Sequence, residues 1–417
     1  MKENKETSDI ATHLPRRRRR ARPHAAARRG AVKRRGRPLQ AASPTGQAGG
    51  VTGAGHGRFR TVVFPGRGRD RRRRISGMTT YAEPRTDLSA LCLDPADTAR
   101  LTELLHDAAR LPGPLERTLQ TEAFAGIAER LPARLREGVE AFRDTPPDHG
   151  LLVVRGLPVG DIPATPSAYG ANVLGESHPS SLLVALVAHP LGGLIGYEDE
   201  KSGALVHDVY PVAGDAAKPL NSGSTLFDFH TENVHHPVRP SHLGLLCLRP
   251  DHDRRAATMV ASVREAEPLL SAADRELLRT DRYRSRFPLS FTRGVAEDER
   301  PVTKPHPVLM DGPAQSPGTR VRFNMHNTFG TDAEAQAALE RLNRAMHAVH
   351  RAVRADRGEM LLVDNRIVVH GRSDFTPRYD GADRWLRRFY PYPGDLPADV
   401  LVRAGGRVLS KDSYARA

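Results

Sequence analysis

The sequence predicts a mainly β fold with helical additions, arranged as an antiparallel double-sheet barrel whose mouth is open to a ligand. Two observations predict it. Helical periodicity fills the first part of the ordinary-composition region, and many short strand-like runs with one long helical interruption fill the rest. The chain has 417 residues of which 39% are hydrophobic, which is enough for a sizeable core.

The helical part is expected over about residues 85–145. Apolar residues recur there at three- and four-residue spacing, first in residues 99–105 and again in residues 127–135. A later apolar run, residues 182–191, fits a helix or a strand equally well.

The β core is expected over about residues 150–395. Residues 150–156 are a short apolar run between two glycines, which predicts a buried strand. From 204 to 263, short β-like runs alternate with Pro, Gly and Asn. Residues 333–354 predict a second long helix, and residues 358–364 return to a strand pattern.

Charge divides the chain sharply. Residues 1–77 hold 22 Lys/Arg and four Asp/Glu, whereas the remaining 340 hold 41 and 45, so the net charge of +14 comes from the tail. This Arg-rich tail has too few large apolar residues to fold, which predicts disorder. We interpret it as an upstream extension that need not be native, because composition becomes ordinary at Met78, and we expect a single folded domain over 78–417. The alternative is an arm that binds nucleic acid or another polyanion non-specifically.

Targeting signals and cysteines narrow the class of protein. No apolar stretch is long enough to cross a bilayer and no secretory pattern opens the chain, so we expect a cytoplasmic protein without a membrane partner. Cys92 and Cys247 lie far apart without a CxxC partner, which argues against disulfides and thiolate metal sites. Each is expected to be a small buried apolar residue.

A metal site is predicted by three separated residues. His230 and Glu232 are two positions apart, so on a strand both point to one face, although chance alone supplies such pairs. His370 ends an apolar strand pattern far downstream. Two imidazoles and one carboxylate leave one side of an octahedral ion open, as Fe(II) requires when it binds a cosubstrate and O2 together. Zinc is the rival metal, but the HExxH helix motif of zinc hydrolases is absent.

Four other histidines crowd the same region and are weaker candidates as ligands. His235 and His236 fall in a turn bounded by proline, and His252 lies between two aspartates in what is expected to be a solvated loop. His242 completes the group.

Several motifs in a fixed order identify a resemblance. Phe-His-Thr-Glu at 229–232, the segments 246–253 and 256–264, and Val-Asp-Asn at 363–365 followed by Asp-Arg-Trp-Leu at 383–386 resemble the clavaminate synthase-like oxygenases. That group includes bacterial hydroxylases of free arginine, lysine and asparagine. The resemblance covers about residues 151–392 and excludes 1–77.

The resemblance implies a distorted double-stranded β-helix, or jelly roll, with extra helices. It also implies an Fe(II)- and 2-oxoglutarate-dependent oxygenase that uses O2 to hydroxylate the β or γ carbon of a free polar L-amino acid such as lysine, arginine or asparagine. Such enzymes serve specialised metabolism, including antibiotic biosynthesis. Desaturation or cyclisation is the nearest alternative. The occupied Glu232 position argues against a related halogenase.

The resemblance also assigns roles to residues downstream of the third ligand. Arg384, fourteen residues after His370, matches the arginine that binds the distal carboxylate of 2-oxoglutarate, and Thr258 matches a threonine that donates to the same group. A guanidinium suits this task because its planar fork binds a carboxylate through two hydrogen bonds. Arg388 matches the residue that holds the α-carboxylate of the substrate.

Strand alternation supports this pair of arginines. On a strand, Arg384 and Arg388 share one face, while Trp385 and Arg387 share the other. Two arginines on one face imply two bound carboxylates. For Arg387 we expect only a surface salt bridge.

Recognition of the substrate side chain is less defined. Arginine hydroxylases of this group present paired acidic residues before the last long helix, but residues 320–326 contain none. Asn324 and His326 are expected to face the pocket instead. The acidic loop 196–201 could supply negative charge, although charged loops are more often merely solvated.

Two other function classes remain open at this point. In one, the Arg-rich tail is the working part and the barrel is a scaffold. In the other, the barrel binds metal but is catalytically silent.

Overall fold

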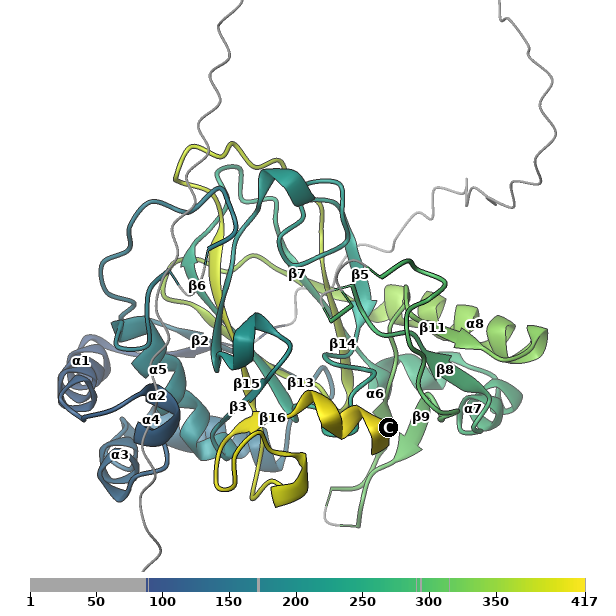
Figure 1. Cartoon of the computed structure of the whole chain (residues 1–417), viewed down its shortest axis with the longest axis horizontal. Coiled ribbons are helices and arrows are strands. Elements are labelled where there is room, and N and C mark those ends of the chain that lie inside the picture. Colours follow the sequence, from purple (N-terminus) through teal and green to yellow (C-terminus); the bar gives the residue numbers. More distant parts are fainter. Residues whose placement is uncertain are drawn as a thin grey trace, which may run out of the picture. The chain divides into compact units, whose positions relative to one another are not determined.

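The computed structural model describes residues 88, 90–170, 173–289, 291–292, 295–314 and 316–416 (Figure 1). These residues belong to one compact unit, Ser76–Ala417. The predicted disorder of residues 1–77 lies outside the described residues. Within the described part, the chain is built from two main β-sheets with helices, which confirms a mainly β fold with helical additions.

The larger sheet contains eight strands among the described residues. Its order is β1 (Ala90–Cys92), β2 (Leu151–Arg155), β13 (Met360–Asp364), β6 (His242–Arg249), β15 (Trp385–Pro391), β3 (Leu194–Tyr197) and β16 (Val408–Leu409), with β4 (Val206–Val209) also paired to β15. The central pairs are antiparallel, whereas β1 with β2 and β16 with β3 are parallel.

The smaller sheet positions the site. Its order is β12 (Arg351–Val353), β7 (Thr258–Ser262), β14 (Val368–Arg372) and β5 (Phe227–His230), all antiparallel. Two short antiparallel pairs lie outside the main sheets, namely β9 (Leu309–Asp311) with β10 (Thr319–Val321) and β8 (Tyr283–Ser285) with β11 (Thr328–Gly330).

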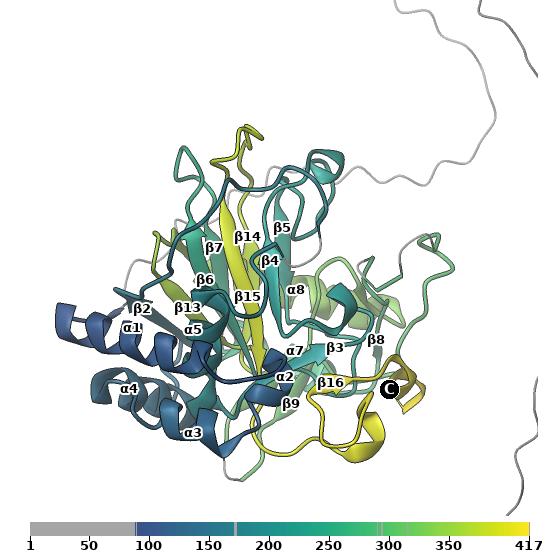
Figure 2. The ribbon, with the colours of Figure 1, turned by 60° about the vertical axis from the view of Figure 1, so that its left-hand side comes forward.

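The helices fall into two groups along the chain (Figures 1 and 2). The first group lies beside the larger sheet and comprises α1 (Pro95–Ala109), α2 (Leu115–Thr118), α3 (Glu122–Ala128), α4 (Ala133–Asp144) and α5 (Pro179–Ala188). The second lies beside the smaller sheet and comprises α6 (Val263–Ala266), α7 (Ala272–Leu278) and α8 (Ala333–Val349). Short 3-10 turns complete the list: η1 (His189–Leu191), η2 (Lys201–Gly203), η3 (Ala213–Asp215), η4 (Glu267–Leu269), η5 (Ala398–Val400) and η6 (Lys411–Arg416).

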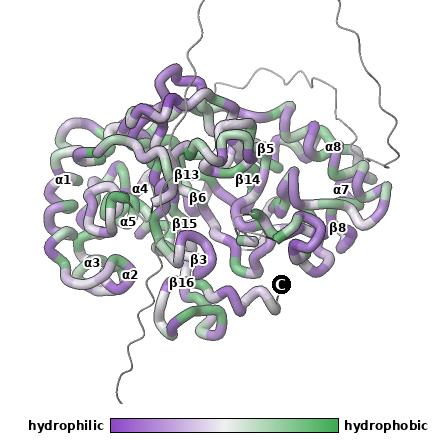
Figure 3. Tube along the Cα trace, turned by 45° about the horizontal axis from the view of Figure 1, so that its top comes forward, coloured by the Kyte–Doolittle hydropathy of each residue, from purple (hydrophilic) through white to green (hydrophobic). Residues whose placement is uncertain are grey.

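Strand β13 shows how the core is divided. Leu361 and Val363 belong to a buried cluster that also contains Val260 and Val369 of the smaller sheet, whereas Met360 and Leu362 belong to a cluster with α1 and α5. Because side chains alternate across a strand, one face of the larger sheet packs on the smaller sheet and the other packs on helices. Figure 3 shows the matching hydropathy, with α5 mostly hydrophobic and the outer turns mostly hydrophilic.

The structure contains the predicted elements, but the boundaries of several differ from those predicted. Residues 127–135 are not one helix, because α3 ends at Ala128 and Pro132 caps the start of α4. The ambiguous run 182–191 is helical through α5 and η1. The long helix predicted to residue 354 ends at Val349, and Arg351–Val353 pair with β7 instead.

The two cysteines differ from each other. Cys247 is buried as predicted, and burial raises the pKa of its thiol to about 12. Cys92 is exposed, so the prediction of a buried residue is wrong there. Among the described helices, none has both the length and the apolar character that a membrane span requires.

Candidate metal centre

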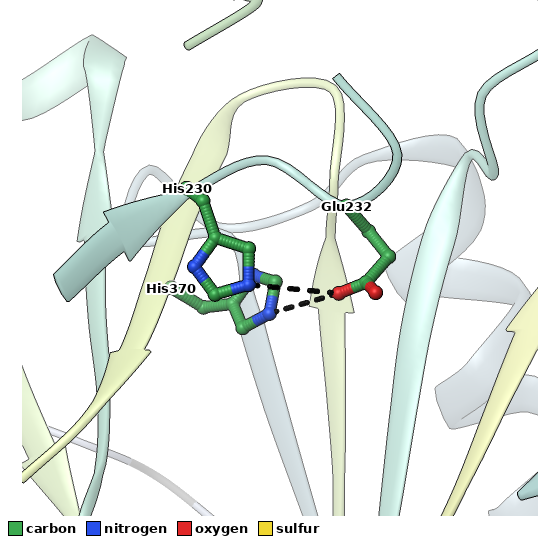
Figure 4. Close-up of side chains that lie close together, drawn as sticks. All are labelled: His230, Glu232 and His370. Atoms are coloured by element: carbon green, nitrogen blue, oxygen red, sulfur yellow. Dashed lines mark ion pairs between the residues drawn. The ribbon is translucent and has the colours of Figure 1, made fainter. Parts of the chain in front are cut away.

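Two neighbouring strands bring the distant histidines together. His230 ends β5 and stands directly opposite His370 of β14, and their ring centroids are 4.1 Å apart. Directly paired residues of antiparallel strands point to the same face of the sheet. Figure 4 shows both imidazoles directed at the carboxylate of Glu232, which follows β5 after one residue. The three residues predicted from the sequence therefore meet.

The three donor atoms lie close enough together to share one cation. Nε2 of His370 lies 3.1 Å from Oε2 of Glu232, and Nε2 of His230 lies 3.9 Å from the same oxygen. One ligand atom from each residue lies within 4.8 Å of the others, and all three side chains are buried. Adjacent ligands about 2.1 Å from a metal are separated by about 3 Å, so small shifts would complete such a site.

Hydrogen bonding prepares His230 to act as a ligand. Its Nδ1 lies 3.0 Å from the carbonyl oxygen of Asp228, which favours the tautomer that donates from Nδ1 and leaves Nε2 with a lone pair. Burial lowers the pKa of His230 to about 3, and the charge of the nearby His370 acts in the same direction. The imidazole is therefore neutral near pH 7, which is the form that binds a metal.

Glu232 is held at its backbone and at one carboxylate oxygen. The side chain of Asn365 accepts from the Glu232 amide at 2.7 Å and donates to its carbonyl at 3.3 Å. Oε1 accepts from Arg388 at 3.0 Å and from Tyr390 at 2.7 Å. Oε2 is fully buried and has no hydrogen-bond partner among the described residues. An anionic oxygen without a hydrogen-bond partner, close to two imidazole nitrogens, fits a cation site.

The electrostatics of Glu232 agree with this. Burial on its own would raise the pKa of the carboxyl, but Arg388 and the two histidines outweigh burial and hold the pKa below its ordinary value. The carboxylate is therefore ionised over the whole physiological pH range.

A second buried network surrounds Arg388. Its guanidinium pairs with Glu200 as well as with Glu232, and it donates to Nδ1 of His207 at 3.0 Å. Tyr390 donates to both Glu200 and Glu232. The expected substrate arginine is thus already paired with two carboxylates. Burial raises the pKa of Glu200, and the Arg388 charge opposes this shift.

The acidic loop 196–201 was expected to be mainly solvated, but this is wrong for Glu200. Glu200 is only 5% exposed, and the Arg388 guanidinium bridges it to Glu232. Glu198 and Asp199 instead bond to the C-terminal segment.

Arg384 and Thr258 line one small cavity of about 10 Å³. Within the described part of the chain, the buried Arg384 guanidinium makes no hydrogen bond or ion pair, and burial lowers its pKa. Thr258 stands opposite Arg372, two residues from His370, so it shares the face of the metal ligands. Burial and the Arg384 charge lower the pKa of Arg372 to about 9. The region is strongly electropositive and suits an anion, which would need neighbouring side chains to move apart.

Asn324 and His326 lie in a tight turn beside the metal ligands. Asn324 forms an antiparallel bridge with His230, so its side chain lies on the same face. Its Oδ1 accepts from the amides of His326 and Asn327, each at 3.0 Å, while its Nδ2 makes no hydrogen bond to a described residue. His326 lies in the same turn but is exposed.

Arg387 differs most from its prediction. It is completely buried, and its guanidinium donates to Asp208 at 2.8 Å and to Ser181 at 2.5 Å. Asp208 also accepts from the indole of Trp385 at 2.9 Å. The surface salt bridge predicted for Arg387 is wrong because α5 covers that face of β15 and the neighbouring strand β4 supplies the buried Asp208. The predicted alternation itself is consistent with this, since Trp385 and Arg387 reach the same carboxylate.

None of the four alternative histidines joins the His230 cluster within the described residues. His235 and His236 are buried among aromatic rings, and His242 bonds to Ser241. His252 pairs instead with Asp380 at 3.0 Å.

Sequence reasoning missed several residues that hold the site. Asp228 directly precedes the motif at 229–232 and Asn365 ends the motif at 363–365, but neither was assigned as a support of the ligands. His207 and Tyr390 carried no signal beyond their strand positions, although Tyr390 is two residues from Arg388 and therefore on its face.

Comparison with known proteins agrees with this geometry. Residues 113–390 match the family described as "Taurine catabolism dioxygenase TauD, TfdA family". The chain is 38% identical to the L-asparagine oxygenase of Streptomyces coelicolor over 76% of its length and 93% of the relative, and 34% identical to clavaminate synthase 2 of Streptomyces clavuligerus over 69% and 88%.

Solved structures show the same class. An asparagine oxygenase in complex with Fe(II), 3-hydroxyasparagine and succinate superposes with a TM-score of 0.71 at 35% identity, over 77% of this chain and 99% of that one. The non-heme iron oxygenase OrfP with Fe and α-ketoglutaric acid gives 0.66 at 28% identity, over 77% and 100%. Both are iron oxygenases with a cosubstrate or its product bound.

The fold and the two-histidine, one-carboxylate cluster thus define an Fe(II)- and 2-oxoglutarate-dependent oxygenase. The chain belongs to the TauD/TfdA dioxygenase family, and its similarity to clavaminate synthase 2 agrees with the resemblance found in its motifs.

Proposed function

We propose that this enzyme hydroxylates the β or γ carbon of a free polar L-amino acid in specialised metabolism. The observation that carries the proposal is the buried ion pair of Arg388 and Glu200 beside the His230, Glu232 and His370 cluster. Curated relatives support it, since they include an L-asparagine oxygenase, an enduracididine beta-hydroxylase and an L-lysine 3-hydroxylase.

The cluster His230, Glu232 and His370 would hold Fe(II) by two nitrogens and Oε2. Bound iron with 2-oxoglutarate and O2 supplies the oxidising power for an unactivated C–H bond. Arg384 and Thr258 would bind the distal carboxylate of 2-oxoglutarate, because they offer a buried guanidinium and hydroxyl without partners among the described residues. Burial of the site would exclude water from the reacting atoms.

A free amino acid matches the Arg388–Glu200 pair. Its α-carboxylate and α-ammonium could exchange partners with the two side chains, so no buried charge would be left unpaired. Arg388 would thus hold the carboxylate, as the family resemblance implies, and Glu200 would receive the ammonium. The contacts of Arg388 with Glu232 and His207 would keep the guanidinium in place before the substrate arrives.

The turn beside His230 favours an asparagine-like side chain over lysine or arginine. The Nδ2 group of Asn324 is a donor without a described partner, and a carboxamide oxygen would accept from it. A guanidinium or ammonium has no acceptor to offer. His326 would border the same end of the pocket.

We also propose that the two facing sheets form the distorted double-stranded β-helix of the family, within one domain that spans residues 78–417. Support comes from the shared core between the sheets and from the similarity to solved oxygenases over 77% of the chain.

Anaerobic reconstitution and a substrate screen test the proposal. Adding Fe(II) and 2-oxoglutarate should produce the weak visible charge-transfer band of the chelate, and His370→Ala should abolish it. The twenty amino acids are then screened for stimulated succinate formation and for a product that gains one oxygen atom. Asparagine should be among the best substrates. A band that survives in His370→Ala refutes the metal assignment, and a product that only loses hydrogen indicates desaturation or cyclisation instead.

A further inference from the structure

The C-terminal segment Val408–Tyr414 lies along the strand that leads into the Glu200 turn. Strand β16 pairs in parallel with β3, with Val408 opposite Gly196 and Leu409 opposite Tyr197. The amide of Gly196 donates to Arg407 at 3.0 Å, and the amide of Glu198 donates to Leu409 at 2.9 Å. A chain segment about 200 positions away in sequence thus continues the sheet up to the edge of the site.

Beyond β16, the same segment binds the carboxylate side chains of the acidic turn. The amide of Lys411 donates to Glu198 at 3.0 Å, and the Tyr414 hydroxyl donates to the two carboxylate oxygens of Asp199 at 2.9 and 2.8 Å. Ser413 Oγ lies 3.1 Å from Nε2 of His236. The Tyr414 ring packs on that imidazole, with centroids 5.0 Å apart.

Three consecutive acidic residues explain why the turn needs these donors. As anions, the carboxylates of Glu198, Asp199 and Glu200 would repel one another. Burial is the main cause that raises the pKa of Asp199, and the Glu198 charge adds to it. The C-terminal segment supplies donors to the first two, while Arg388 supplies the third. Of the three carboxylates, Glu200 is therefore the one that pairs with Arg388 beside the metal cluster.

The backbone after Glu200 is strained. Lys201 and Ser202 have φ values of 51° and 58°, and Gly203 has 79°. Two non-glycine residues in the left-handed region persist only where the surroundings over-determine them. Gly203 packs on Val408, since a Cβ there would lie 3.0 Å from that side chain. Glu200 therefore sits between a strained segment and the C-terminal segment that fixes it.

We propose that Val408–Tyr414 is a latch that holds Glu200 in its substrate-binding position, and that Tyr414 is a positioning residue for the amino acid. The inference rests on the proposed function of Glu200. The latch touches neither the metal cluster nor the Arg384 cavity through any contact between described residues. It should therefore affect binding of the amino acid and leave binding of 2-oxoglutarate unchanged.

Tyr414→Phe tests the latch in the full-length protein, because it removes the hydroxyl and keeps the ring packed. Loss of a charge-assisted hydrogen bond should raise the KM for the amino acid about five- to tenfold, with the KM for 2-oxoglutarate within about twofold of wild type. Tyr210→Phe is the matched control. It also loses one hydroxyl bond, to the Ala168 carbonyl at 3.2 Å, but it lies off the latch and should leave both constants unchanged.

Hydrogen exchange gives a readout that does not depend on turnover. Amides of residues 198–203 should exchange about tenfold faster in Tyr414→Phe than in wild type, without a matching change in β13. In an Asp199→Ala background, Tyr414→Phe should have no further effect, because the pair acts as one unit.

Two outcomes would overturn the latch. One is unchanged exchange and an unchanged KM for the amino acid in Tyr414→Phe. The other is an equal rise in both KM values, which would mean a general loss of structure. If wild type converts no amino acid, the proposed function fails, whereas the exchange experiment still decides whether Tyr414 orders the turn.

Discussion

Asn365→Ala tests whether the proposed metal ligand Glu232 is held by its backbone. The Asn365 side chain is buried and makes three hydrogen bonds, two with the Glu232 backbone at 2.7 and 3.3 Å and one with the Pro240 carbonyl at 2.9 Å. Alanine removes all three and leaves the Glu232 amide without a partner.

The magnitude follows from these bonds. Each is worth about 0.5–1.5 kcal/mol net, so the free energy of unfolding should fall by about 2–4 kcal/mol. The substitution leaves the three metal ligands in place but removes the hydrogen bonds that position Glu232. Affinity for Fe(II) or Co(II) should therefore fall about 10–100-fold. Urea denaturation measures the first quantity, and anaerobic metal titration measures the second.

Asn343→Ala is the matched control. Asn343 is also buried, but its Oδ1 has no hydrogen-bond partner among the described residues and it lies on α8. Its substitution should leave metal affinity at the wild-type value. If Asn365→Ala binds metal as tightly as wild type, the backbone of Glu232 is positioned by something else and the reasoning is refuted.

Four further outcomes are expected. Co(II) at about 100 times its Kd should stabilise the protein by about 2.7 kcal/mol, measured as a rise in Tm, and His370→Ala should remove this gain. Asp208→Ala should cost about 3–5 kcal/mol in urea unfolding because it leaves the buried Arg387 charge unpaired; a loss below 1 kcal/mol would contradict this. Burial lowers the pKa of His242 to about 4, so between pH 7 and pH 5 the unfolded chain takes up a proton at this residue and the folded chain does not. The free energy of unfolding should therefore fall by about 2 kcal/mol over this range because of His242, and His242→Gln should reduce this pH dependence. A chain that starts at Met78 should keep full activity, and activity that requires the tail but not the metal cluster would favour the polyanion-binding alternative.

Local sequence patterns determined the elements and the chemistry of the ligands. Period-two and period-3.6 spacing located β2, β13, α1 and most of α8, because each pattern reflects which side of an element meets the core. The residue types His230, Glu232 and His370 implied an iron site because ligand preference is a property of the side chain itself. The resemblance placed Arg384 and Thr258, which share one cavity in the structure.

Tertiary structure alone decided the partners of buried polar groups. Arg387 and Arg388 are neighbours in sequence, yet the first pairs with Asp208 under α5 and the second joins the metal cluster through Glu232. The sequence offered the acidic loop 196–201 only as a possible source of negative charge, whereas the pairing of β3 with β15 brings Glu200 into contact with Arg388 and Tyr390. The physical reason is that a charged side chain is solvated, paired or ligating according to what packs over it, and that cover comes from segments far away in the chain.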